Sequence, residues 1–317
     1  MSANKLEGSA VDNKFAFGVD IGGTTIEIGL FSQEGKILSQ MVLPTNTTEN
    51  GQWILGDISA QIQKMLQENG LSKSTVLGIG IGVPGPVTEN GLVKGCVNLG
   101  WDYFNVKEEM ENLTGLTVVA DNDANLAALG EAWQGAAQGC RNCVFVTLGT
   151  AVGGGVIVDG KLLHGAFASA GEIGHILVEP DEKEACTCGN YGCLEQYAST
   201  KGLLRMAQKM GITRFHEAKE IYDNAKQGYG PALEMTWKAA DYLGRGLSAV
   251  ACVVDPEIFI LGGGISHAGT FLLEEVQDAY QRYAFHASRD AKFALAMLGN
   301  QAGMYGGVKK LLDELQK

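Results

Sequence analysis

The 317-residue sequence lacks any long apolar run, and this absence limits the class of protein. No stretch approaches the roughly 18 apolar residues that a membrane-spanning helix needs, so we expect no membrane span. The first 14 residues, MSANKLEGSAVDNK, also lack the apolar centre of a signal peptide. The sequence therefore predicts a cytoplasmic protein.

Positive charge is scarce as well, with 24 Lys and Arg residues against 36 Asp and Glu residues and a net charge of -12. This balance disfavours a broad nucleic-acid surface, which needs a basic face. Phosphate ligands remain compatible with it, because backbone N–H groups and Mg²⁺ can supply the positive field. The length and the 45% hydrophobic content favour a globular protein of two domains.

Cysteine is present in an odd number, seven, and three of these residues crowd together at Cys186, Cys188 and Cys193. His175 lies 11 positions before the first of them. Three thiolates and one imidazole make the ligand set of a structural zinc site. Free thiols or a disulfide are the alternatives, and the absence of a secretory segment favours metal or reduced thiols over bridges.

A Cys₃His set fills all four zinc positions, so we expect one structural Zn²⁺ that shapes a polar pocket and activates no water. Gly189 and Gly192 would let the chain turn tightly enough for the sulfurs to face one ion. Glu172 and Glu195 bracket the cluster, and metal binding would draw them together.

A glycine-rich turn follows the first predicted strand, residues 15–20, in the motif Asp20-Ile-Gly-Gly-Thr-Thr25. The amides of Gly22 and Gly23 can face phosphate oxygens, and Thr24 adds a hydroxyl group. Asp20 could hold Mg²⁺ through water. A glycine-rich hairpin with a capping Asp is the alternative interpretation.

Residues 143–163 repeat this hairpin plan about 127 positions later, with Thr147-Leu-Gly149 in place of Asp20-Ile-Gly22. The repeat predicts two copies of one domain plan and a second phosphate turn at Gly149 and Thr150. A plain glycine-rich strand pair is again the alternative.

Two further buried strands, 76–83 and 258–261, each run into a glycine loop. Ligands of open α/β sheets lie at the carboxyl ends of strands, which singles out Gly85 in the first loop. The second loop, Gly262-Gly-Gly264, suits a nucleotide base or ribose. Asn98, on a predicted loop, could bind a polar ligand or only satisfy a turn.

The segment Asp121-Asn-Asp-Ala-Asn125 joins a short strand at 117–120 to a helix that reaches Trp133. One Asn or Asp at this place could simply cap the helix. The cluster is richer than a cap requires, which favours a general base with Asn122 orienting the substrate. The pattern does not choose among Asp121, Asp123 and Asn125. Residues 54–68, 200–250 with a break at 228–231, and 303–315 are predicted to be helical.

Taken together these motifs resemble the ROK family (repressors, open reading frames, sugar kinases), and among its members the bacterial ATP-dependent glucokinases. The resemblance extends from about residue 15 to nearly the end of the chain. The motifs that carry it are Asp20-Ile-Gly-Gly-Thr24, Asn122-Asp123, Leu148-Gly-Thr150, Gly171-Glu-Ile-Gly-His175, Cys186-x-Cys-Gly-x-x-Gly-Cys193-Leu-Glu195 and Leu261-Gly-Gly-Gly264.

The resemblance implies a duplicated α/β fold of the actin-like ATPase (ribonuclease H-like) class, with the active site in a cleft between two lobes. We assign residues 1–120 plus 303–317 to the smaller lobe and 121–302, with the zinc loop, to the larger. It also implies a hexose and ATP with Mg²⁺ as ligands and a homodimer, while the acidic balance and the lack of an apolar run predict no nucleic-acid or membrane partner.

For the site, the resemblance implies that Asp123 is the catalytic base. Sugar hydroxyls would be held by Asn122, Glu172, His175 and Glu195, with His175 using one ring nitrogen for zinc and the other for sugar. ATP phosphates would lie against Gly22, Gly23, Thr24, Gly149 and Thr150, and adenosine against Gly262, Gly263 and Gly264. The sequence departs from the family at Thr25, where relatives commonly carry Lys, and at Ala151, where they commonly carry Gly.

The implied activity is transfer of the γ-phosphoryl group of Mg-ATP to the 6-hydroxyl of glucose. A kinase for another hexose, such as N-acetylmannosamine, allose or fructose, is the nearest alternative. A sugar-sensing repressor is less favoured, because about 14 residues precede the first strand where such relatives carry a DNA-binding module.

Overall fold

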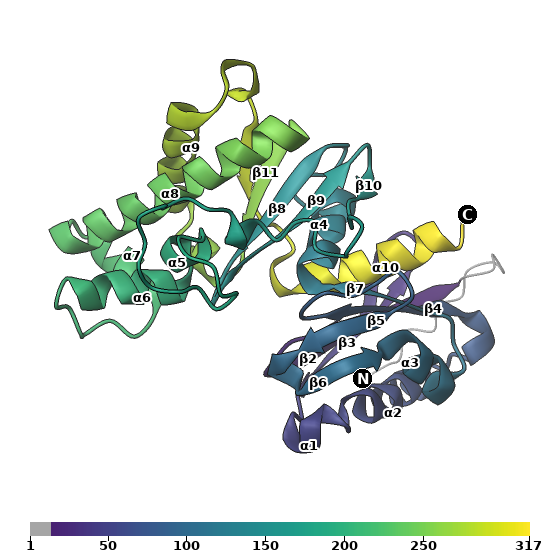
Figure 1. Cartoon of the computed structure of the whole chain (residues 1–317). Helices are drawn as coiled ribbons and strands as arrows, with labels where there is room; N and C mark the ends of the chain where they lie inside the picture. The colour runs from purple at the N-terminus through teal and green to yellow at the C-terminus, as the bar shows by residue number, and fades with distance from the viewer. Residues whose placement is uncertain (1–13) are drawn as a thin grey trace, which may run out of the picture. The chain divides into compact units, whose positions relative to one another are not determined.

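The computed structural model describes residues 14–317, which divide into two compact units (Figure 1). Unit 1 comprises the described residues up to Ala120 together with Gly307–Lys317, and unit 2 comprises Asp121–Gly306. No helix within residues 14–317 is long and apolar enough to cross a membrane.

Unit 1 is built on a five-stranded sheet of order β3-β2-β1-β4-β7. Its central strand β1 runs antiparallel to β2 and parallel to β4. The strands are β1 (Phe15–Ile21), β2 (Thr25–Ser32), β3 (Ile37–Pro44), β4 (Val76–Val83) and β7 (Val118–Asn122), with a separate antiparallel pair β5 (Leu92–Cys96) and β6 (Trp101–Asn105). Its helices are α1 (Thr48–Gly51), α2 (Ile54–Glu68) and α3 (Val106–Thr114), with short 3₁₀ turns η1 (Lys73–Thr75) and η2 (Val97–Leu99).

Unit 2 holds a second five-stranded sheet, of order β10-β9-β8-β11-β12. The strands are β8 (Cys143–Leu148), β9 (Val152–Val158), β10 (Lys161–Leu162), β11 (Ile258–Gly262) and β12 (Lys292–Leu295). The helices are α4 (Asp123–Gln134), α5 (Glu195–Ala198), α6 (Thr200–Lys209), α7 (Ala218–Lys226), α8 (Gly230–Val254) and α9 (Thr270–Tyr283). The 3₁₀ turns are η3 (Ile173–His175), η4 (Gly264–Ala268), η5 (His286–Ser288) and η6 (Gly299–Gln301).

The two sheets follow the same plan, as the repeated hairpin predicted. In unit 2, β8 runs antiparallel to β9 and parallel to β11, which is the arrangement of β1 with β2 and β4. The two predicted phosphate turns therefore follow equivalent strands. The two glycine loops, after β4 and after β11, also occupy equivalent places.

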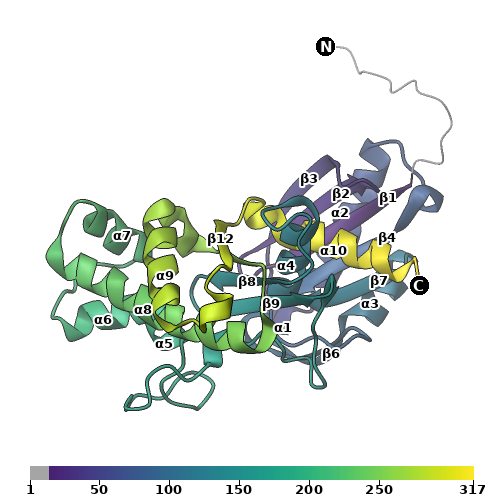
Figure 2. The ribbon, with the colours of Figure 1, turned by 90° about the horizontal axis from the view of Figure 1, so that it is seen from above.

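Alternating side chains of the unit 2 sheet pack into two separate cores. Val144 and Val146 of β8 lie in the larger core, which helices α6, α7, α8 and α9 cover, while Phe145 lies in the smaller core with Leu126 and Leu129 of α4. This period-2 alternation is what a strand buried on both faces requires. Figure 2 shows α8 and α9 side by side, and their residues pack extensively.

Helix α10 (Ala302–Glu314) begins in unit 2 and ends in unit 1. The sequence-based assignment placed residues 303–306 with the first lobe, whereas they group with unit 2. The reason is a close backbone approach, because a Cβ atom on Gly306 would lie 1.7 Å from the carbonyl oxygen of Leu126 in α4. The next residue, Gly307, makes a similarly close backbone contact with β4, because a Cβ atom on it would lie 2.7 Å from the Gly80 carbonyl oxygen.

This contact makes Gly306 intolerant of a side chain. We expect Gly306→Ala to destabilise the protein by about 1–3 kcal/mol, because α10 must move away from α4 to admit the methyl group. Gly56→Ala is the matched control. Gly56 is exposed on α2, and a Cβ atom added there would meet no other atom within 4 Å, so alanine should stabilise the helix by about 0.5–1 kcal/mol. Urea unfolding of both variants measures the difference, and equal effects would contradict the packing argument.

Candidate functional site

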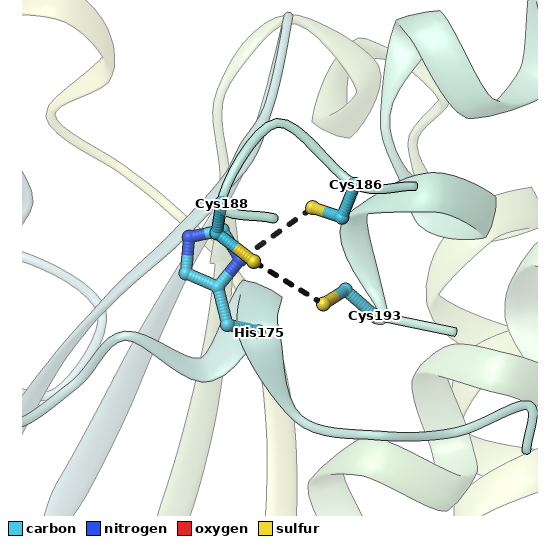
Figure 3. A group of neighbouring side chains, drawn as sticks. All are labelled: His175, Cys186, Cys188 and Cys193. Carbon is cyan, nitrogen blue, oxygen red and sulfur yellow. Dashed lines mark hydrogen bonds between the residues drawn. The ribbon is translucent and has the colours of Figure 1, made fainter. Parts of the chain in front are cut away.

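Three sulfur atoms and one imidazole nitrogen converge in unit 2, as the cysteine spacing predicted (Figure 3). The ligand atoms of His175, Cys186, Cys188 and Cys193 all lie within 4.8 Å of one another. Cys186 Sγ lies 3.8 Å from His175 Nδ1, and Cys188 Sγ lies 3.7 Å from Cys193 Sγ. Within the described chain none of the three cysteines is in a disulfide. The group has the composition and spacing to hold a metal ion.

Backbone hydrogen bonds fold the segments that carry these ligands onto each other. The Val178 N–H donates to the Gly192 carbonyl at 2.8 Å, and the Leu194 N–H donates to the Ile176 carbonyl at 2.9 Å. Gly192 has a φ of 72°, and a Cβ atom there would lie 1.9 Å from the Glu179 carbonyl oxygen. Gly189 has a φ of 91°, so both glycines serve the tight turn predicted for them.

A partly buried ion pair anchors the segment that leads into Cys186. The Glu182 carboxylate accepts a hydrogen bond from the Tyr197 hydroxyl at 2.5 Å and from Arg205 at 2.8 Å. Burial opposes ionisation of Glu182, but these donors outweigh burial and lower its pKa to about 2. The cluster is therefore held to α5 and α6 by side chains outside the ligand set.

Glu195, the first residue of α5, lies at the edge of the cluster. Its Oε1 atom accepts a hydrogen bond from Thr187 Oγ1 at 2.8 Å and lies 3.2 Å from Cys186 Sγ. The predicted sugar-binding carboxylate is thus attached to the same loop as the metal-ligating group. Thr187 was not singled out in the sequence, because a single Thr between two cysteines carries no distinctive signal.

The candidates for the general base lie at the corner between β7 and α4, where their contacts differ. Asn122 is the N-cap of α4, and its Oδ1 accepts the Asn125 N–H at 3.1 Å. Asp121 is 1% exposed, and its carboxylate already accepts hydrogen bonds from the Asn122 N–H, from Asn125 Nδ2 and from His164. A carboxylate so enclosed has no access to a substrate hydroxyl, so it is a poor general base.

Asp123 is different, because it is partly exposed and its carboxyl group is perturbed. Packing around the carboxyl group desolvates its charged form and raises its pKa to about 6, although the Ala124 N–H and the Asn122 side chain stabilise that form. The negative charge of Glu172 contributes to this rise. A carboxylate with a pKa near neutrality is suited to accept a proton.

The predicted phosphate turns have the expected backbone geometry within each unit. In unit 1, the Gly22 N–H donates to the Thr25 carbonyl at 2.9 Å, and a Cβ atom on Gly23 would lie 3.8 Å from Asn98 Cβ. Asn98 therefore lies beside the first turn, while Gly85 has a φ of 98° in its own loop.

In unit 2, the Gly149 N–H donates to the Ala151 carbonyl at 3.0 Å. Gly263 packs on the end of β8, where a Cβ atom would meet the Leu148 carbonyl oxygen at 2.6 Å. The loop of Gly262, Gly263 and Gly264 is therefore adjacent to the second turn, although the two are more than 100 residues apart in the sequence.

A pocket of about 170 Å³ in unit 2 connects the second turn with the metal-ligating loop. Thr150 and Glu195, predicted for phosphate and sugar respectively, both line it. The remaining lining residues are Ala151, Glu184, Ala185, Cys186, Thr187, Gln196, Ser199, Lys201, Gly202 and Arg205. Cys186 and Ala151 had been singled out in the sequence, whereas the others, most of them from α6 or the segment around Cys186, had no signal of their own.

Comparisons with known proteins agree with this geometry. The model of the ROK family matches residues 16–313. A glucokinase of Halalkalibacterium halodurans is 38% identical over 97% of this chain and 98% of its own. The structure of a ROK family glucokinase from Streptomyces griseus in complex with glucose and AMPPNP is similar, with a TM-score of 0.77, 36% identity, and coverage of 93% of this chain and 98% of that one. A ROK hexokinase from Thermus thermophilus has a TM-score of 0.85 and 32% identity, over 95% of this chain and 99% of its own.

These likenesses and the two equivalent sheets confirm the predicted fold class, a duplicated α/β fold of the actin-like ATPase type. The likeness extends over nearly the whole described chain rather than over one motif.

The raised pKa of Asp123 predicts a pH-dependent cost to stability. Because the folded state disfavours its charged form, Asp123 destabilises the protein at pH values above its folded pKa of about 6. Asp123→Asn should therefore be more stable than the wild type at pH 8, by up to about 3 kcal/mol. The advantage should narrow as the pH falls through 6 toward 4, where both proteins carry a neutral group. Urea unfolding at several pH values measures it, and a difference that does not vary with pH would rule the shift out.

Proposed function

The chain belongs to the ROK family, and from this premise we propose that it is an ATP-dependent hexokinase that phosphorylates the 6-hydroxyl of glucose. The observation that carries the proposal is the Asp123 carboxyl group, with its raised pKa, next to Asn122 and the charge of Glu172. The glucokinase relatives, among them one whose structure holds glucose and AMPPNP, support glucose as the acceptor.

In the proposed reaction Asp123 is the general base. The oxygen of the sugar 6-hydroxyl forms a bond to the γ-phosphorus of ATP, the bond from that phosphorus to the β–γ bridging oxygen breaks, and ADP leaves. The hydroxyl proton passes to the Asp123 carboxylate. Phosphoryl transfer depends mainly on positioning and charge stabilisation, so the base acts late and needs only a moderate pKa.

Four further side chains of unit 2 would bind the sugar hydroxyls: those of Asn122, Glu172, His175 and Glu195. His175 Nδ1 lies 3.8 Å from Cys186 Sγ, which leaves Nε2 as its atom for a sugar hydroxyl. Gly85 and Asn98 of unit 1 would add contacts to the same substrate.

ATP would be bound through its phosphates by backbone N–H groups of Gly22, Gly23 and Gly149 and by the hydroxyl groups of Thr24, Thr25 and Thr150. The pocket lined by both Thr150 and Glu195 supports this arrangement, because it adjoins a predicted phosphate contact and a predicted sugar contact. Asp20 would hold Mg²⁺ through water, and Gly262, Gly263 and Gly264 would contact adenosine.

The cysteine cluster would hold one Zn²⁺ through His175, Cys186, Cys188 and Cys193. Three sulfurs and one imidazole within 4.8 Å of one another fit tetrahedral zinc in both chemistry and size. Bound zinc would supply cross-linking of the loop and no catalysis, since the protein ligands fill its coordination sphere. The consequence is a fixed placement of His175 and Glu195.

The first test is an ADP-release assay of the wild type and Asp123→Asn over glucose, N-acetylmannosamine, allose and fructose. Glucose should give the highest kcat/KM of the four. The variant should lose about 10²- to 10⁴-fold in kcat, because no group accepts the hydroxyl proton, while glucose binding by calorimetry is largely kept.

Asp223→Asn is the matched control, since Asp223 is an exposed carboxylate on α7 that pairs with Lys219 at the surface. It should leave kcat unchanged. Near-normal kcat in Asp123→Asn would remove Asp123 as the base, and a different preferred hexose would move the substrate assignment to that sugar.

Metal content tests the zinc site. The wild type should retain one zinc per chain through gel filtration, and Cys193→Ser should lose it because the buried sulfur is replaced by a poor zinc ligand. Phosphorylation of glucose should then fall about 100-fold or more, since His175 and Glu195 lose their support. Cys252→Ser, an exposed cysteine outside the cluster, is the control and should keep both metal and activity. Full activity in metal-free wild type would refute the zinc assignment.

A further inference from the structure

A hydrogen-bonded pair, the buried Asp121 and the partly buried His164, lies outside the set of residues assigned above to substrate or metal. Their side chains are 1% and 21% exposed, and His164 Nε2 lies 2.7 Å from Asp121 Oδ2. The residues are 43 positions apart, with Asp121 on the β7–α4 corner and His164 two residues after the end of β10. The pair therefore connects two segments of unit 2 that are remote in the chain.

One side of this connection leads directly to Asp123. Asp121 Oδ1 accepts the backbone N–H of Asn122 at 2.8 Å and the side-chain amide of Asn125 at 3.0 Å. Asn122 in turn caps α4 and stabilises the ionised Asp123 carboxylate through its side chain. A displacement of Asp121 would therefore shift the backbone that presents Asp123.

The other side leads to Glu172. The His164 carbonyl accepts the Ala170 N–H at 3.2 Å, so the loop from His164 to Ala170 closes on itself two residues before Glu172. Gly171 then packs on β9, where a Cβ atom on Gly154 would lie 2.8 Å from the Gly171 carbonyl oxygen. The chain between His164 and Glu172 is thus fixed at Ala170, which bonds back to His164, and at Gly171, which packs on β9.

We propose that His164 is a positioning residue, which through Asp121 holds the Glu172 segment against the Asp123 corner and so sets the geometry of hexose binding. This inference rests on the proposed function, because Asp123 and Glu172 are its sugar-binding carboxylates. It adds a role for a residue that touches neither substrate nor metal. Glu172 is a charged group that faces Asp123, and Asp121 is one that faces His164.

Two substitutions separate the hydrogen bond from the shape of the side chain. His164→Phe keeps a planar ring but removes the donor to Asp121, and His164→Gln keeps a donor near the position of Nε2. His164→Phe should raise KM for glucose about 10-fold or more, with KM for ATP little changed, because sub-ångström errors in the position of binding groups are costly. His164→Gln should restore most of the glucose affinity. His286→Ala, an exposed histidine on η5, is the matched control and should behave as the wild type.

The pH profile gives a second readout that a purely structural role would not move. Release of the Glu172 segment removes negative charge from the neighbourhood of Asp123 and admits water, and both changes lower the pKa of the base. The acid limb of kcat/KM should therefore move to lower pH in His164→Phe, by about half a pH unit or more, and return in His164→Gln. If His164→Phe does not accumulate as folded protein, His164→Ala takes its place with the same expectations.

A His164→Phe enzyme with wild-type KM for glucose and an unmoved acid limb would overturn the inference, as would equal increases in KM for glucose and ATP. A wild type that phosphorylates none of the hexoses would instead overturn the proposed function. In that case, ¹³C NMR titration of the Asp123 carboxyl group in the wild type and His164→Phe still decides the positioning role. A lowered Asp123 pKa in the variant supports it, and an unchanged pKa refutes it.

Discussion

The proposed chemistry of unit 2 depends on one unfavourable interaction, the desolvation of the Asp123 carboxyl group. Burial and the charge of Glu172 keep its pKa near 6, while a backbone N–H and the Asn122 side chain keep the ionised form accessible. Such a group persists only where surrounding structure holds it in place. Here the capped start of α4 and the buried Asp121 carboxylate provide that support.

The segment between η3 and α5, residues 176–194, carries the three cysteines and is held in place without a helix or strand of its own. Backbone hydrogen bonds between residues 176–178 and 192–194 and the Glu182–Arg205 ion pair fix its path. The four metal-ligating groups then converge with the imidazole Nδ1 turned toward the sulfurs. Glu195 follows the last cysteine by two residues, so the same loop positions a carboxylate beside the pocket.

Local sequence patterns predicted several of the helices and strands. The strand at 76–83 and the helix at 54–68 were predicted with the bounds that β4 and α2 have, because each is a strongly patterned segment between clear breaks. The break near residues 228–231 separates α7 from α8, whereas the further break between α6 and α7 carried no Pro and was missed. The sequence also could not predict that the boundary between the two units falls within α10. That boundary depends on tertiary contacts, since Gly306 packs on the backbone of Leu126 and Gly307 on that of Gly80.

By itself, the sequence determined the duplicated plan, the two glycine turns and the Cys₃His group, since each depends on spacing within a short stretch or on a direct repeat. Only the tertiary structure decided which of the candidates Asp121, Asp123 and Asn125 can act as a base, because the burial that encloses Asp121 and perturbs Asp123 comes from neighbours in the whole unit. The Asp121–His164 pair likewise exists only in the fold, since nothing in either residue's local sequence specifies a partner 43 positions away.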